Sequence, residues 1–101
     1  MKRRQVRFTA TALLHCKREK EWWVENRADG DNFTEDLADA LRLVASFPAA
    51  GTSYTATALP GVRRLYLQKV GVHLYYTFDD DDAIVRALWG ARRRRGPRLK
   101  R

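Results

Sequence analysis

The chain has 101 residues, a net charge of +8 and 45% hydrophobic residues, which favours one domain over residues 1–101 with a single compact core. No apolar run approaches the roughly 18 residues of a membrane helix, and the basic N-terminus lacks the apolar run and cleavage site of a signal peptide. Cys16 is the only cysteine, which excludes an internal disulfide and a cysteine-built zinc site and favours a reducing cytoplasm.

The N-terminal region predicts a short strand followed by an amphipathic helix. Apolar and polar residues alternate over 5–9, which is typical of a strand. Thr9 or Thr11 can cap the next element by accepting a hydrogen bond from an unpaired helix N–H. The segment 12–26 contains no glycine or proline and predicts a helix, although Glu19 lies near its apolar stripe and weakens it.

The second predicted helix, at 33–47, has the clearest pattern in the chain. Its apolar residues recur at helical spacing and are Phe33, Leu37, Ala40, Leu41, Val44 and Phe47. Asn32 and Glu35 have the spacing of a capping box, and Pro48 ends the helix. A short turn at 27–31 separates the two helices, which predicts an antiparallel helical hairpin.

The remaining chain predicts a loop and a sheet. Small and hydroxyl residues dominate the loop at 49–60. Three strand-like runs at 62–67, 72–78 and 83–89 follow, with turns at 69–71 and 79–82. Short links between successive strands imply an antiparallel meander. The order strand, helix, helix, strand, strand, strand predicts an α+β domain, with the helical hairpin packed on one face of a small, mainly antiparallel sheet.

The run 72–78 alternates cleanly and assigns its residues to the two faces of the sheet. Leu74 and Tyr76 must point toward the helices. The opposite face is expected to be partly open. The residues expected to line it are His73, Tyr75 and Thr77.

Positive charge is concentrated at the end of the chain. Residues 90–101 hold seven of the 20 basic residues and no acidic one, whereas the other 89 residues are nearly neutral. This asymmetry favours a polyanionic partner, either a nucleic acid or an acidic protein. A solvated tail that aids solubility is the alternative.

Several residue patterns together resemble the RelE/ParE toxin superfamily over nearly the whole chain. In the helices they are Trp22-Trp23-x-x-Asn26-Arg27 and Phe33…Leu37…Ala40-Leu41…Pro48…Gly51…Tyr54. In the strands they are Gly61-Val62-Arg63-Arg64-Leu65, His73-Leu74-Tyr75-Tyr76 and Trp89-x-Ala91-Arg92-Arg93-x-x-Gly96-Pro97. The sequence is most similar to the ParE branch, often described as plasmid-stabilisation proteins. Cys16 and Glu19 depart from the apolar residues expected in the first helix.

The resemblance implies the toxin of a type II toxin–antitoxin module, held inactive by a cognate antitoxin with an acidic toxin-binding segment. ParE-like members inhibit DNA gyrase. RelE-like members cut messenger RNA on the ribosome. Neither activity requires a cofactor or a metal ion.

The nuclease alternative requires a base, an acid and cationic stabilisation of the phosphorane. The positions that match RelE-like catalytic positions are Arg64, Tyr66, His73 and Arg92. His73 is the candidate with a pKa near neutrality, because His15 is expected on the opposite, helical side. The tyrosine found near the C-terminus of RelE-like enzymes is missing, which favours gyrase inhibition. His73 is equally compatible with a structural role on the sheet.

A partner-binding surface is expected where the sheet meets the basic tail. Its residues are Trp89, Arg92, Arg93, Arg94, Arg95, Arg98, Tyr75 and Trp22. Only one of Trp22 and Trp23 can face the sheet, so the other is expected at an interface. Arg86 lies in an apolar strand and is expected to form an ion pair. A non-toxic nucleic-acid-binding domain remains a third alternative.

Overall fold

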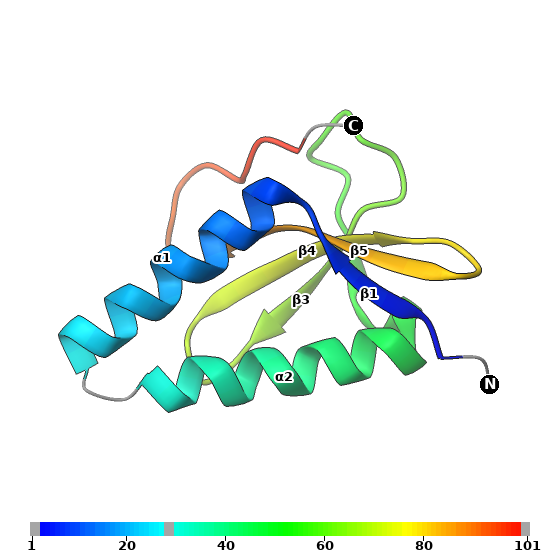
Figure 1. Ribbon diagram of the computed structural model, residues 1–101. Helices are drawn as coiled ribbons and strands as arrows, with labels where there is room; N and C mark the ends of the chain where they lie inside the picture. The colour runs from blue at the N-terminus through cyan, green and yellow to red at the C-terminus, as the bar shows by residue number, and fades with distance from the viewer. Residues whose placement is uncertain (1–2, 28–29, 100–101) are drawn as a thin grey trace.

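The computed structural model describes residues 3–27 and 30–99 (Figure 1). Its helices are α1 (Ala10–Arg27), α2 (Gly30–Ser46) and the short 3-10 helix η1 (Pro48–Ala50). Its strands are β1 (Gln5–Phe8), β2 (Thr52–Ser53), β3 (Arg63–Leu67), β4 (Val72–Phe78) and β5 (Asp82–Gly90). The predicted α+β class and the order of its main elements are confirmed.

The strands form one mixed sheet in the order β1-β5-β4-β3-β2. β3, β4 and β5 make the predicted antiparallel meander, and β1 lies parallel to β5. The prediction of a loop over 49–60 is wrong in part, because η1 and β2 fall within it. In β2, Thr52 and Ser53 pair antiparallel with the beginning of β3 and extend the sheet by one strand.

Both helices begin earlier than the sequence pattern predicted. Thr9 is the cap of α1, since its hydroxyl oxygen accepts a hydrogen bond from the Ala12 N–H at 3.1 Å. α2 already begins at Gly30, so the capping box predicted at Asn32 is wrong. Asp31 provides the acidic residue in the first turn of α2, where a negative charge is stabilised by the helix dipole. Two residues of the predicted turn, 28 and 29, lie outside the described residues.

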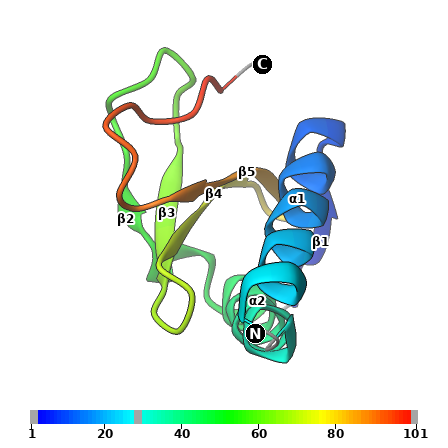
Figure 2. The ribbon, with the colours of Figure 1, turned by 90° about the vertical axis from the view of Figure 1, so that its left-hand side faces the viewer.

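The main core lies between the helical hairpin and one face of the sheet (Figure 2). Leu74 and Tyr76 of β4 are buried in it, as predicted. Val44 of α2 and Val85 of β5 are also fully buried there. The Tyr76 hydroxyl donates a hydrogen bond to the Pro48 carbonyl at 2.6 Å and accepts one from the Gly51 N–H at 2.9 Å. This ring therefore fastens the chain after α2 to the sheet.

The opposite sheet face carries a second, smaller apolar cluster. Its buried residues are Leu59, Val62, Tyr75 and Ala87, and Tyr54, Trp89 and Leu99 pack against it. The prediction that Tyr75 lines an open face is therefore wrong, because only 2% of this residue is exposed. The loop before β3 and the returning C-terminal segment cover it. No described helix is long and apolar enough to cross a membrane.

A β-bulge in β5 sets which of its residues face each cluster. Tyr75 pairs with Ala87 and Tyr76 with Val85, so Arg86 is the extra residue. The Arg86 Nε–H donates a hydrogen bond to the Thr77 hydroxyl at 2.9 Å. This hydrogen bond orients the guanidinium along the sheet.

Candidate functional site

A row of three rings crosses the outer sheet face next to the second cluster. His73 on β4 lies opposite Tyr66 on β3 and opposite Trp89 on β5. The Tyr66 and His73 ring centroids are 5.1 Å apart. Tyr66 is 49% exposed and His73 and Trp89 are half-buried, so the row is accessible at its Tyr66 end.

Two arginines lie over aromatic rings at the margins of this row. The Arg93 guanidinium carbon is 4.2 Å from the Trp89 ring centroid, and that of Arg64 is 5.3 Å from the Tyr54 centroid. Contacts of this kind contribute about 0.5–1 kcal/mol each when exposed. They hold positive charge against the sheet.

Partial burial and the nearby Arg64 guanidinium lower the pKa of His73 from its ordinary value. The imidazole is therefore mainly neutral near pH 7 and can accept a proton, but it is a poor acid there. Three of the four predicted catalytic residues, Arg64, Tyr66 and His73, lie on the same sheet face. The fourth, Arg92, follows β5 and lines a groove with Tyr66.

This groove, about 780 Å³ in volume, lies between the C-terminal half of α1, the β3–β4 turn and residues 90–93. Both Trp22 and Trp23 line it. Trp22 is 46% exposed, whereas Trp23 also packs against the core, so one of the pair faces the sheet, as predicted. Burial raises the pKa of the Glu19 carboxyl group, which also lines the groove. The Trp23 indole N–H near Glu19 has no partner with hydrogen-bond geometry among the described residues.

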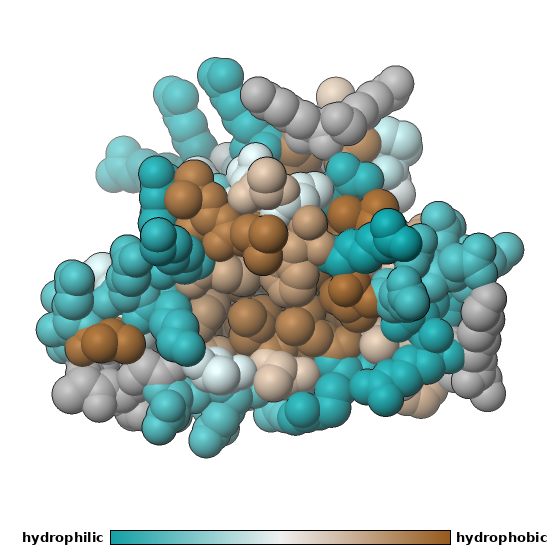
Figure 3. Space-filling view, viewed as in Figure 1, coloured by the Kyte–Doolittle hydropathy of each residue, from teal (hydrophilic) through white to brown (hydrophobic). Residues whose placement is uncertain are grey.

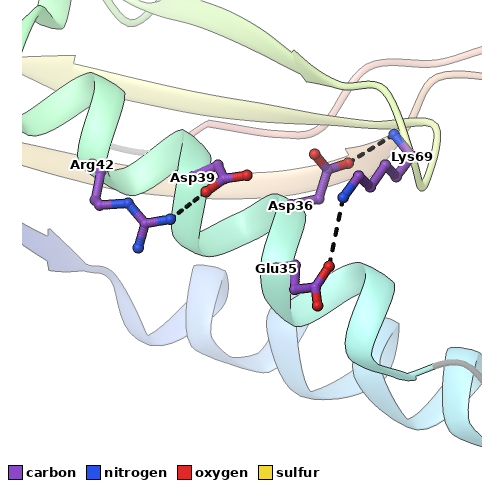
Figure 4. A network of polar contacts seen from close by, with 5 residues as sticks. All are labelled: Glu35, Asp36, Asp39, Arg42 and Lys69. Carbon is purple, nitrogen blue, oxygen red and sulfur yellow. Dashed lines mark hydrogen bonds and ion pairs between the residues drawn. The ribbon is translucent and has the colours of Figure 1, made fainter.

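Polar contacts from α2 hold the β3–β4 turn, which forms one wall of this groove (Figure 4). The Lys69 backbone N–H donates to the Asp36 carboxylate at 2.8 Å. The Lys69 ammonium lies 3.5 Å from the Glu35 carboxylate. On the same helix, Arg42 donates to Asp39. The two contacts of Lys69 fix the turn relative to α2.

The basic tail exposes its arginine side chains although its backbone folds back. The exposed arginines of the expected binding surface are Arg92, Arg93, Arg94, Arg95 and Arg98. The Trp89 indole N–H donates a hydrogen bond to the Arg95 carbonyl, which folds the tail back over the sheet. Tyr75 lies beneath this fold and is not a surface residue.

His15 lies near Trp89, which corrects the expectation that it sits on the far, helical side. Its ring centroid is 5.7 Å from that of Trp89, and its Nδ1 accepts a hydrogen bond from the Leu88 N–H at 3.2 Å. β1 pairs with β5 only as far as Val85, and α1 covers the edge beyond. His15 therefore pairs with the Leu88 N–H at the edge of β5. The sequence pattern did not indicate this contact.

The Asp79–Asp82 turn uses its first carboxylate internally. The Asp79 side chain accepts hydrogen bonds from the N–H groups of Asp82 and Asp81, at 2.8 and 2.9 Å, and these bonds lower its pKa. Within residues 3–27 and 30–99, no group of three or more His, Cys, Asp or Glu side chains is placed to hold a metal ion.

A further surface that the sequence analysis missed lies between the two helices. Figure 3 shows apolar side chains gathered in the centre of this face and hydrophilic ones around it. Phe8 of β1 and Leu41 of α2 pack against the core and remain partly accessible. Leu13 and Leu14 of α1 are 56% and 45% exposed.

The fold is that of the RelE/ParE superfamily of toxins. Residues 6–95 match the model of the family described as ParE toxin of type II toxin–antitoxin system, parDE, and the chain belongs to this family. No curated protein matches the chain in sequence.

Two solved structures share the fold at low identity. One, described as a chromosomal ParDE toxin–antitoxin system from P. aeruginosa, has a TM-score of 0.70 and 12% identity, covering 89% of this chain and 98% of its own. The other, a YoeB dimer from Staphylococcus aureus, has a TM-score of 0.62 and 14% identity, covering 86% of this chain and 95% of its own. At these identities the likeness concerns the fold alone.

Proposed function

We propose that this toxin inhibits DNA gyrase by binding it, without catalysis of its own, and that a cognate antitoxin neutralises it. The observation that carries the proposal is the cover over that part of the outer sheet face to which Tyr75 belongs. Tyr75 is buried under the loop before β3 and the C-terminal segment, where a nuclease would have to admit an RNA backbone.

His73 is also a poor proton donor for RNA cleavage. The leaving 5′ oxygen requires an acid, and the lowered pKa of His73 leaves this ring mainly neutral near pH 7. In place of the C-terminal tyrosine of RelE-like enzymes stand Gly96, the buried Pro97 and Leu99. Arg64 and Arg92 still supply positive charge, which suits binding as well as catalysis.

The antitoxin is proposed to cover the apolar surface between α1 and α2 with an amphipathic segment. Such a segment buries its apolar face in a groove of this kind. The polar residues of such a segment would meet the hydrophilic side chains that surround the apolar centre. Leu13→Asp, at a residue that is 56% exposed, should therefore weaken antitoxin binding more than Leu43→Asp, the same substitution at a residue of α2 that is 40% exposed.

The decisive experiment is a supercoiling assay with purified gyrase, with and without the purified chain. Inhibition that is reversed by the antitoxin is expected. His73→Ala and Tyr66→Phe should leave inhibition intact, because these residues serve only the nuclease alternative. Full supercoiling at a molar excess of folded chain would reject the proposal.

The ribosome-dependent nuclease is the second candidate, because Arg64, Tyr66 and His73 share one sheet face. Mapping of mRNA ends after induced expression tests it directly. Cleavage within codons that disappears in His73→Ala would establish the nuclease and displace gyrase inhibition. DNA damage without such cleavage would support the gyrase inhibitor.

A further inference from the structure

A second cavity, separate from the groove beside Trp22, lies where α1 begins, β5 ends and the C-terminal segment returns. It has a volume of about 630 Å³. Its lining consists of Thr9, Thr11, His15, Arg86, Trp89, Arg95, Gly96 and Arg98. These residues come from both ends of the chain, so only the folded protein contains this cavity.

The cavity wall is strongly cationic. Three arginines, Arg86, Arg95 and Arg98, line it, and no carboxylate does. Arginine presents a planar fork of donors that matches the oxygen atoms of phosphate and carboxylate groups. Thr9 and Thr11 stand at the N-terminus of α1, an 18-residue helix whose dipole adds positive potential at this end.

The remaining polar groups are arranged as donors. The Nδ1 of His15 accepts the Leu88 N–H, so the neutral ring carries its proton on Nε2. The Arg86 guanidinium is oriented by its bond to Thr77. The hydrogen bond from the Trp89 indole to the Arg95 carbonyl holds the tail in place as the outer wall.

We propose that this cavity binds a phosphate ester of nucleotide size. Three guanidinium groups match a doubly charged phosphate better than a single carboxylate, and the helix N-terminus adds to the same preference. The volume lies within the usual range of ligand sites, about 300–1,000 Å³, and a phosphate alone would leave most of it unfilled. The rest of the cavity accommodates the sugar and base.

The test is isothermal titration of the purified, full chain with adenosine monophosphate, inorganic phosphate and adenosine. Binding of the monophosphate but not of adenosine is expected. Arg95→Ala and Arg98→Ala should each weaken it about tenfold, the usual effect of losing a charged hydrogen bond. Arg94→Ala removes the same charge from the same segment outside the cavity, and should change affinity by less than about twofold.

Arg98→Lys separates geometry from charge, since it keeps the charge but loses the planar fork. This variant should bind the monophosphate more tightly than Arg98→Ala does, but less tightly than the parent. Circular dichroism of each variant checks that the fold is intact. Chemical-shift changes at the His15 ring and the Trp89 indole on titration with the monophosphate would place the ligand in this cavity.

Two further probes identify the source of the phosphate. Tighter binding of a phosphodiester dinucleotide would indicate a nucleic-acid strand, and tighter binding of the monophosphate would indicate a free nucleotide. Four outcomes would each overturn the proposal. They are equal weakening by all three alanine variants, binding of adenosine alone, tighter binding of a glutamate-rich peptide, and no binding of the monophosphate. The assay contains no gyrase, so its failure and that of the proposed inhibition are distinguishable.

Discussion

Tyr76 shows how one side chain can link several elements. It lies on β4, is fully buried, and bonds through its hydroxyl to the backbone on both sides of the η1 segment. The space for this arrangement depends on Gly51, because a Cβ there would lie 2.6 Å from the Tyr76 hydroxyl and 2.9 Å from the Arg64 carbonyl. The residue pattern predicted burial of the ring but not its hydrogen bonds.

Tyr76→Phe should destabilise the protein by about 1–3 kcal/mol, because it leaves the buried Gly51 N–H and Pro48 carbonyl without this partner. Urea unfolding followed by circular dichroism measures the change. Tyr66→Phe removes a hydroxyl from a ring that is 49% exposed and should change stability by less than about 0.5 kcal/mol. Equal effects of the two substitutions would contradict this account.

Cys16 should react slowly with thiol reagents. Burial, with a smaller contribution from Glu19, raises the pKa of its thiol to about 11. The reactive thiolate should then be about a hundredfold scarcer at pH 8 than for a thiol with the ordinary value of 9.0. The rate of disulfide exchange with an aromatic disulfide reagent, compared between native and urea-unfolded protein, measures this difference. Similar rates in both states would refute it.

The C-terminal segment is the element whose position matters most for both proposals. It turns back after β5, Pro97 is buried, and Leu99 packs on the second cluster. Gly96 lies so close to the Tyr54 hydroxyl that a Cβ would clash with it. The path of this segment therefore depends on the glycine at position 96.

Gly96→Ala should displace this segment and increase the rate of trypsin cleavage at the arginines that follow β5. The matched control is Gly90→Ala, because a Cβ at Gly90 would meet Arg93 at 3.8 Å, an ordinary contact. Limited proteolysis followed by mass spectrometry gives both rates. Cleavage of the Gly96 variant at the parent rate would mean that Tyr54 simply moves aside.

At the scale of the molecule, stability should fall as the pH decreases from 7.5 to 5.5. The pKa values of His15 and His73 are both lowered, mainly by burial. A histidine with a folded-state pKa below its unfolded value of about 6.5 binds protons more weakly when folded. Its stabilising contribution is complete above that value and is lost as the pH falls through the folded-state pKa.

Unfolding free energies at several pH values, measured for the parent and for a His15→Gln, His73→Gln double variant, test this dependence. The double variant should have a flatter profile over this range. An unchanged slope would show that these two rings do not carry the effect. Single coincident transitions by fluorescence and circular dichroism justify the two-state treatment.

The tertiary structure also redistributes the charge that the sequence places at both ends. Near the N-terminus, the Arg4 Nε–H donates to the Asp79 carbonyl at 2.6 Å, and Arg7 lies 3.5 Å from the Asp82 carboxylate. This basic cluster thus lies beside the acidic β4–β5 turn. The arginines after β5, by contrast, are exposed and have no acidic residue in their own segment.

The sequence by itself determined the α+β class, the helical hairpin, the meander and the residues that pack between them. Apolar residues recur with a period of about 3.6 in a helix and 2 in a strand. This spacing is a local property of the sequence, and it indicates which side of α2 and of β4 is buried. The resemblance to the toxin superfamily rested on similarly local motifs, and the family match over residues 6–95 confirmed it.

Only the tertiary structure decided which face of the sheet stays accessible. Tyr75 is covered because residues more than ten positions away, Leu59, Val62 and Leu99, meet over it. His15 reaches the edge of β5 because β1 ends at Phe8, far from β5 in the sequence. Such contacts depend on how distant segments return to one another, and no periodicity within a short segment encodes that.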